Sequence, residues 1–305
     1  MSVILVTGGS GMVGQHVAEV IAARGLAARL ADVAWPAGRD RAPPGERVTF
    51  DICDPAACRA QARGVRAVVH CAAVVGPQRA RVDPLATLAV NVGGTANLLE
   101  AASEAGVRLV AISTATLYGH RADLSPLPED APADPLTVYD GTKLMAETYC
   151  AAHRRTYGSD AASIRTGFVY GFGSQIGEYF LPRALRGEAI VEAAGCDHPC
   201  DFTYVVDLAE ALVAAALAPS LPASVYNVTG GVIRTRGDLA GVVTKLVPGA
   251  RITLGAGIDP ARHLRGPCVI ERARQDFGWT PRFTLETGIA DWKRRLEESD
   301  AADGP

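Results

Sequence analysis

The sequence predicts an α/β fold in which a doubly wound parallel sheet carries a smaller C-terminal α+β lobe. Short apolar, β-branched runs alternate with amphipathic segments of helical period over the first half of the chain. A glycine-rich turn joins the first apolar run to the first helical segment. Beyond about residue 170 this alternation becomes irregular, as expected of a separate lobe.

The elements expected in the first half follow one another with short links. Residues 3–7 form a continuous apolar run, which is typical of a strand buried on both faces. Val13, Val17 and Ile21 then recur at helical spacing until Gly25 ends the segment. The other expected strands span 27–33, 47–50, 66–71, 107–113 and 161–165, and the expected helices span 55–63, 84–105 and 138–157.

The second half predicts a mixed set of shorter elements. Helices are expected near 180–186, 207–218, 236–246 and 285–297, and strands at 204–206 and 225–228. A chain of 305 residues is near the size at which one hydrophobic core stops growing. We therefore expect a cofactor-binding domain over residues 1–170 and a mainly substrate-binding lobe over 171–305. Segments at about 201–230 are expected to return to the large sheet.

Composition excludes several classes of function. The hydrophobic fraction of 48% predicts a packed core, and a net charge of −3 without a basic run argues against nucleic acid as a partner. No apolar stretch approaches the roughly 20 residues of a membrane span, and the first residues lack the basic start of a signal peptide. We expect a cytoplasmic protein that binds a small molecule.

The seven cysteines predict no metal site. Most of them stand singly among apolar residues, as reduced cytosolic thiols do. Cys196, His198 and Cys200 alone resemble a ligand cluster, and they offer at most three soft ligands with no second cluster to complete a tetrahedral site.

Gly8, Gly11 and Gly14 predict a dinucleotide-binding turn of the Rossmann type. They follow an expected strand and open an expected helix, whose first residues are Met12 and Val13. Glycines let backbone N–H groups approach a pyrophosphate, and the N-terminal helix dipole attracts its charge. We expect all five residues to bind the cofactor.

Asp32, at the end of the second expected strand, indicates which dinucleotide binds. A carboxylate at this position accepts hydrogen bonds from the adenosine ribose hydroxyls and repels a 2′-phosphate. The next three residues, Val33, Ala34 and Trp35, include no Arg that would pair with such a phosphate. NAD is therefore the expected cofactor.

Tyr139 and Lys143 form a candidate catalytic pair. They are four residues apart and share one face of an expected helix that Thr137 would cap, with Asp140 at the third helical position. The pKa of a free Tyr is about 10, so a nearby ammonium is needed to favour the phenolate. Tyr139 would then take the proton of an alcohol while Lys143 holds the nicotinamide ribose.

Further segments in order along the chain accompany these motifs: Asp51-Ile52, His70 to Ala73, Asn91 to Thr95, Ser113 to Gly119, Asp201 to Asp207, Tyr226 to Val228 and Phe277 to Pro281. Together with the glycine turn and the Tyr-Lys pair, they resemble the extended short-chain dehydrogenase/reductase family, the NAD-dependent epimerase/dehydratase group. The resemblance covers nearly the whole chain.

This resemblance implies roles for individual residues. Asp51 and Ile52 would contact the adenine, and Ala72, Ala73 and Asn91 would complete the cofactor site. Thr114 would hydrogen-bond the reacting oxygen beside Tyr139, with Ser113 as the competing candidate. The family also tends to form homodimers through the helices expected at 84–105 and 138–157.

The chain departs from the family pattern on the substrate side. Phe168 and Cys200 stand where nucleotide-sugar members usually carry Asn and Arg, so two donors to a diphosphate are missing. Arg262 or Arg265 is a candidate to supply that charge. Ala115 and Thr116, candidate substrate residues, replace the acid and base of sugar dehydratases. We therefore expect no dehydration and weak binding of UDP or dTDP.

The sequence favours an NAD-dependent oxidoreductase or epimerase that acts on a secondary alcohol of a sugar or sugar-like substrate. One alternative is a dehydrogenase or reductase of a small, non-nucleotide hydroxy compound. Another is a non-catalytic NAD-binding regulatory protein, but such proteins commonly lose the Tyr or Lys that this chain keeps.

Overall fold

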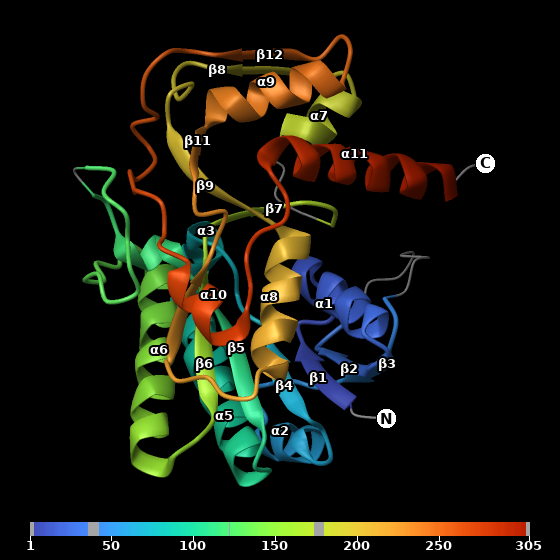
Figure 1. Cartoon of the computed structure of the whole chain (residues 1–305), viewed down its shortest axis with the longest axis vertical. Helices are drawn as coiled ribbons and strands as arrows, with labels where there is room; N and C mark the ends of the chain where they lie inside the picture. Colours follow the sequence, from blue (N-terminus) through green and yellow to red (C-terminus); the bar gives the residue numbers. More distant parts are fainter. Residues whose placement is uncertain (1–2, 36–42, 122, 174–179, 303–305) are drawn as a thin grey trace.

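The computed structural model describes residues 3–35, 43–121, 123–173 and 180–302. A large sheet carries helices on both faces, and a smaller lobe lies beyond one edge of that sheet (Figure 1). In the described part of the chain, no helix has the length and apolar character needed to span a bilayer.

The large sheet has seven strands in the order β10-β6-β5-β4-β1-β2-β3, and every neighbouring pair is parallel. The strands are β1 Val3–Thr7, β2 Ala27–Asp32, β3 Glu46–Thr49, β4 Ala67–His70, β5 Arg108–Thr114, β6 Ala161–Thr166 and β10 Val225–Val228. The direction of winding reverses between β1 and β4, and ligands of such sheets bind at the carboxyl ends of the strands beside this switch point. The predicted doubly wound fold is confirmed.

Helices cover the sheet from two sides because its strands are apolar on both faces. Ile4 and Val6 of β1 pack into one cluster with α1 (Met12–Ala23) and α8 (Val205–Leu217). Leu5, between them, packs into the opposite cluster. That second cluster includes α2 (Pro55–Ala62), α5 (Thr95–Glu104) and α6 (Val138–Tyr157). The alternation of β1 side chains therefore builds both hydrophobic layers.

The helix expected over 84–105 consists of three consecutive segments. After α3 (Pro77–Val82), these are α4 (Pro84–Leu88), the π-helix η1 (Ala89–Gly94) and α5. The Thr95 hydroxyl donates a hydrogen bond to the Asn91 carbonyl at 2.7 Å, so a side chain also engages the backbone here. Single π turns are frequent at functional sites, and this one places Asn91 beside the sheet edge.

The smaller lobe combines short strands and helices. β7 (Phe168–Tyr170), β9 (Pro199–Tyr204) and β11 (Ile233–Thr235) form one sheet, and β8 (Ala189–Glu192) pairs with β12 (Arg251–Leu254). Their helical partners are α7 (Phe180–Leu185), α9 (Arg236–Leu246) and α11 (Leu285–Ala302). Between these elements the chain returns to the large sheet through α8 and β10, and α10 (Glu271–Phe277) packs beside β10.

The strand expected over 204–206 is wrong at two of its three residues. Strand β9 ends at Tyr204, and Val205 and Val206 already belong to α8. The Asp207 carboxylate, in the first turn of that helix, accepts hydrogen bonds from the Arg282 and Phe283 amides. These long-range contacts fix the helix start where β propensity alone favours a strand.

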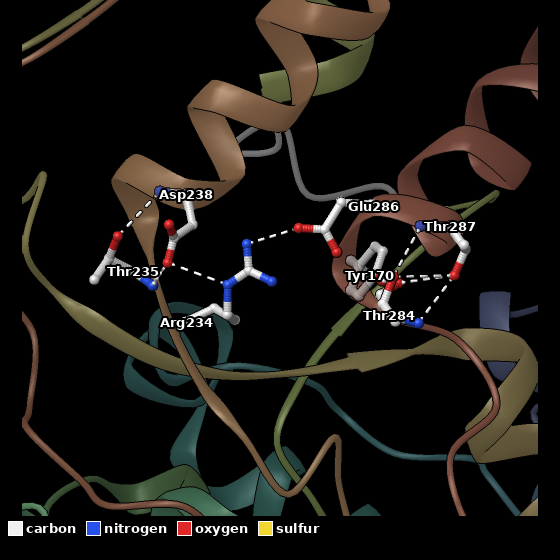
Figure 2. A network of polar contacts seen from close by, with 7 residues as sticks. All are labelled: Tyr170, Arg234, Thr235, Asp238, Thr284, Glu286 and Thr287. Atoms are coloured by element: carbon white, nitrogen blue, oxygen red, sulfur yellow. Dashed lines mark hydrogen bonds and ion pairs between the residues drawn. The ribbon is translucent and has the colours of Figure 1, made fainter.

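A polar network fixes two helices of the lobe relative to each other (Figure 2). The Arg234 guanidinium bridges Asp238 of α9 at 3.2 Å and Glu286 of α11 at 2.8 Å. Thr235 and Asp238 form a capping box at the start of α9. One arginine thus joins the N-terminal turns of both helices above β11.

Candidate active site

The glycine turn between β1 and α1 brings backbone unusually close to backbone. A Cβ on Gly14 would lie 2.3 Å from the Gly8 carbonyl oxygen, and a Cβ on Gly8 would lie 2.7 Å from the Ala72 nitrogen. Gly8 also has a φ of +70°. Gly11 is the N-cap residue of α1. The first amides of the helix, beginning with those of Met12 and Val13, therefore lie at the end of this turn. This cradle fits the pyrophosphate of a dinucleotide.

Asp32 lies at the carboxyl end of β2, beside this turn. One carboxylate oxygen accepts hydrogen bonds from the Ser10 amide and hydroxyl, and the other accepts from the Val33 amide. The carboxylate is therefore held at the edge of the cradle where an adenosine ribose is expected.

The other predicted cofactor residues follow neighbouring strands at the same sheet edge. Asp51 and Ile52 come after β3, and Ala72 and Ala73 come after β4. The Asp51 carboxylate accepts a hydrogen bond from the Cys53 amide, and Ile52 is buried. Because parallel strands end on one side of the sheet, the fold gathers all four residues beside the glycine turn.

Asn91 is fully engaged within the protein. Its side-chain oxygen accepts from the Val74 amide at 2.8 Å, and its amide group donates to the Val74 carbonyl and to Thr142, both at 3.1 Å. Asn91 thereby ties the loop after β4 to helix α6. The sequence predicts Asn91 to contact the cofactor, and in the structure its side chain instead holds this loop in place.

Tyr139 and Lys143 lie on one face of α6, which begins as the sequence predicts. The Thr137 hydroxyl caps the helix by accepting from the Asp140 amide at 3.1 Å. The Lys143 ammonium donates to the Ile112 carbonyl of β5 at 2.8 Å. Burial lowers the pKa of Lys143 to about 8.

The Tyr139 hydroxyl has no hydrogen-bond partner among the described residues, so it is available to a ligand. Burial raises the pKa of Tyr139 well above its usual value, and the charge of Asp140 adds to that rise. Formation of the phenolate therefore depends on positive charge, from the Lys143 ammonium or a bound cofactor.

Thr114, the last residue of β5, lies in a chain of hydrogen bonds. Its hydroxyl pairs with the Thr116 hydroxyl at 2.8 Å, and the Thr116 hydroxyl donates a short hydrogen bond to Asp140. Ser113 is buried, and its hydroxyl has no partner among the described residues. Ala115 packs into a small apolar cluster with Leu117 and Tyr118.

Phe168 and Cys200 line a small pocket in the lobe together with Arg262. Phe180, Phe202, Arg236 and Leu239 complete its wall. The Phe168 ring meets Phe202 edge-on at 5.4 Å, and Arg262 pairs with Asp259 at 3.0 Å. Side chains leave about 10 Å³ of space, roughly enough for one water molecule.

Positive charge surrounds Cys200 although its own side chain carries none. Burial raises the pKa of Cys200 to about 11, and Arg262, Arg236 and Arg265 each oppose that rise. Arg236 is buried and paired with Glu192 at 2.5 Å. Carboxylates neutralise much of this charge, because Arg236 and Arg262 are paired with Glu192 and Asp259.

Arg265 differs from the other two arginines in its partners. No carboxylate among the described residues lies within ion-pair distance of it, and its hydrogen bond to the Gly119 carbonyl is long, at 3.4 Å. Burial lowers the pKa of Arg265, which the charge of Asp140 partly offsets. It is therefore a half-buried cation close to the catalytic helix.

Three participants in the site were not identified from the sequence as such. Asp140 was assigned only a place in the first turn of α6, and Arg236 carries no recognisable motif. His70 bridges Thr7 at 2.7 Å and Thr95 at 3.0 Å beneath the cleft, and burial lowers its pKa to about 3. The sequence signal that pointed to His70 was a histidine at the end of an expected buried strand.

Comparisons with known proteins agree with this geometry. A model of the NAD dependent epimerase/dehydratase family matches residues 4–229. UDP-glucuronic acid decarboxylase 1 of Danio rerio is 29% identical, over 94% of this chain and 70% of the relative. The solved UDP-glucose 4-epimerase of Thermus thermophilus, a complex with NAD, is 27% identical, with a TM-score of 0.84 over 97% of this chain and 99% of that chain.

A third relative was solved with a sugar nucleotide and NAD together. The structure of MoeE5 in complex with UDP-glucuronic acid and NAD is 26% identical, with a TM-score of 0.83 over 96% of this chain and 99% of that chain. The resemblance to the extended short-chain dehydrogenases and the expectation of NAD are confirmed. The chain therefore belongs to the NAD-dependent epimerase/dehydratase family of sugar-nucleotide enzymes, with NAD as its cofactor.

Proposed function

We propose that this enzyme oxidises a secondary alcohol of a negatively charged sugar. Bound NAD supplies the hydride acceptor for that oxidation. Tyr139 and Thr114 hold the reacting oxygen, Tyr139 exchanges its proton, and Lys143 favours the phenolate and binds the nicotinamide ribose. The cradle at Gly8, the Asp32 carboxylate and the available Tyr139 hydroxyl support this assignment.

The observation that carries the choice of a charged sugar is the state of Arg265. A half-buried guanidinium without a carboxylate partner among the described residues lowers the stability of the folded protein unless an anion pairs with it. Its charge acts on Asp140 of the catalytic helix and on Cys200 of the lobe, so it lies between both halves of the site. A diphosphate or a sugar carboxylate provides the missing anion.

The site favours oxidation or epimerisation over dehydration. Elimination of water needs an acid and a base beside the oxidised carbon. Ala115 is buried in an apolar cluster, and Thr116 carries a hydroxyl. The Asp140 carboxylate accepts hydrogen bonds from the Thr116 and Thr137 hydroxyls, so it would act on the site through a hydroxyl and not directly beside the oxidised carbon.

Binding of charged and neutral sugars tests the proposal. Phe168 and Cys200 alone predict weak binding of UDP, but Arg265 offers a positive charge that they lack. We therefore expect calorimetry to detect UDP-glucose or UDP-glucuronic acid, and not glucose. Arg265→Met should weaken that binding at least about tenfold, because it removes a charge-assisted hydrogen bond. The matched control is Arg274→Met, which removes an exposed arginine paired with Glu271. Equal binding of neutral glucose, or no effect of Arg265→Met, would contradict the proposal.

The same experiment, followed by product analysis, separates two outcomes of the chemistry. An epimerase returns the hydride to the opposite face, so it purifies with NAD and forms no net NADH. A dehydrogenase releases a ketone or lactone together with NADH. Absorbance of NADH during turnover of the sugar that binds best distinguishes them.

A second candidate is a dehydrogenase of a small hydroxy compound without a nucleotide. The observation that favours it is the pocket at Phe168 and Cys200. Its side chains leave about 10 Å³ of space, which is too little for a diphosphate. Screening of free sugar acids and hydroxy acids for NADH formation tests this alternative, and a UDP-sugar that binds in the micromolar range would exclude it.

We further propose that the enzyme is a homodimer through α4 and α6. Large apolar side chains are exposed on these helices: Leu85 is 76% exposed, Met145 54% and Leu88 40%. The two helices are in contact, and large apolar side chains exposed on neighbouring helices are expected at an interface. Light scattering should give twice the chain mass, and Leu85→Glu with Met145→Glu should give a monomer. A wild-type monomer at micromolar concentration would contradict the proposal.

A further inference from the structure

Three side chains connect the reacting centre to a buried carboxylate. The Thr114 and Thr116 hydroxyls are 2.8 Å apart, and Thr116 donates to one oxygen of Asp140. The other oxygen of Asp140 accepts from the Thr137 hydroxyl at 2.7 Å. Asp140 is 3% exposed and Thr114 is 6% exposed, whereas Thr116 between them is half-buried, so both ends of the path are enclosed by protein.

The directions of these hydrogen bonds are fixed by the number of protons available. A carboxylate only accepts, and each hydroxyl carries one proton. Thr116 gives its proton to Asp140, so it must accept the proton of Thr114. The Thr116 amide donates to the Thr114 oxygen at 3.2 Å, which occupies one lone pair. Thr114 therefore keeps one lone pair with which its oxygen can accept a further hydrogen bond.

An acceptor at this position suits an alcohol whose proton points towards Thr114. The raised pKa of Tyr139 keeps that residue protonated in the absence of added positive charge, so it donates to the same oxygen. The alcohol proton then has a route other than Tyr139. The charge of Asp140, at the end of this route, acts on the Tyr139 phenol and on the Arg265 guanidinium.

We propose that Thr114, Thr116 and Asp140 form a second proton route, in which the proton of the substrate alcohol is relayed to the buried Asp140 carboxylate. The alcohol O–H bond breaks and its proton binds Thr114, while the Thr114 proton passes to Thr116 and the Thr116 proton to Asp140. The hydride leaves the same carbon for NAD, so a ketone and a protonated Asp140 result. The proposal rests on the proposed oxidation of an alcohol.

This relay makes Asp140 a positioning residue that acts through Thr116. An enclosed carboxylate keeps the proton within the site, where it can return to the oxygen when the ketone is reduced. The same carboxylate supports the start of α6 through Thr137, so a purely structural role is the competing explanation.

The test separates the two roles by changing Thr116 alone. Thr116→Val keeps the shape and removes the hydroxyl, and Thr116→Ser keeps the hydroxyl as a matched control. Both substitutions are introduced into the wild type and into Tyr139→Phe, in which the relay is the remaining route for the substrate proton. With the best-bound UDP-sugar, we expect Thr116→Val to lower kcat at least about tenfold further in Tyr139→Phe and Thr116→Ser to restore it. KM should change little. The thermal unfolding temperature of Thr116→Val should fall by a few degrees, about the effect of one lost hydrogen bond to the buried Asp140, so kcat is compared well below that temperature.

A second readout does not depend on turnover. Neutron diffraction from deuterium-exchanged crystals should place the Thr114 deuteron towards Thr116 and the Thr116 deuteron towards Asp140. A Thr114 deuteron directed into the cleft would overturn the relay, as would equal kcat for Thr116→Val and Thr116→Ser in Tyr139→Phe. If the wild type oxidises no charged sugar, the proposed function fails, and the neutron map still decides the proton directions.

Discussion

The Asp32 carboxylate accepts hydrogen bonds from both the amide and the hydroxyl of Ser10, at 3.0 and 2.7 Å. This contact ties the end of β2 to the glycine turn, so the carboxylate proposed to bind the ribose is part of the wall of the turn proposed to hold the pyrophosphate.

We expect Asp32→Ala to narrow the preference for NAD over NADP by about tenfold or more, because it removes a charged acceptor of the ribose hydroxyls and the repulsion of a 2′-phosphate. Fluorescence titration with both dinucleotides measures the change. Ser10→Ala is the matched control, since it leaves the carboxylate in place. An unchanged ratio in Asp32→Ala would show that other residues select the cofactor.

Tyr139→Phe retains the ring and removes the hydroxyl. We expect kcat to fall by about 10²–10⁴-fold with nearly unchanged NAD affinity, which is the scale of general acid–base catalysis. Steady-state kinetics and NAD titration measure the two quantities. Activity close to that of the wild type would refute the role of Tyr139.

Thr114→Ala and Ser113→Ala decide which hydroxyl serves the reacting oxygen. Thr114 is connected to Thr116 and Asp140, whereas the buried Ser113 hydroxyl has no partner among the described residues. We expect Thr114→Ala to lower kcat more than Ser113→Ala. The opposite order would transfer the role to Ser113.

Lys143 should make stability depend on pH. Burial lowers its pKa from 10.5 to about 8, so between these values the unfolded chain binds a proton that the folded protein has released. Stability therefore rises with pH across this window. At pH 7, where both states are protonated, Lys143→Met should be more stable than the wild type by about 1–3 kcal/mol.

Denaturant unfolding of both proteins at several pH values measures this difference. The advantage of Lys143→Met should shrink as the pH rises from 8 towards 10.5. The variant should also lose turnover, which the Lys143 ammonium supports through Tyr139. A constant difference in unfolding free energy across the window would argue against the lowered pKa.

Local signals predicted the catalytic helix and the glycine turn. Thr137, Tyr139, Lys143 and the helix end near Tyr157 lie where the sequence placed them, because capping and periodicity act within a few residues. The short strands β8 and β11 were missed, since three or four residues carry little alternation. The boundary at Val205 is set by contacts with residues far along the chain.

The site likewise has a part that local signals predict and a part that depends on long-range contacts. The cofactor residues follow strands, so a parallel sheet was enough to predict that they gather at one edge. The link from Thr116 to Asp140 and the ring of arginines around Cys200 join residues that are distant in sequence. No single-sequence pattern encodes such contacts, although the departure at Cys200 marked the region as unusual.

Strand β10 has a consequence for how this chain is made. It is the outer neighbour of β6, yet all elements from β7 to α8 separate the two strands in the sequence. As the chain leaves the ribosome, β6 can pair with β5 while its other side still exposes unpaired backbone groups. Such an open edge is a template for association with other chains. We therefore expect the nascent chain to associate with other chains more readily before residue 228 emerges than after it.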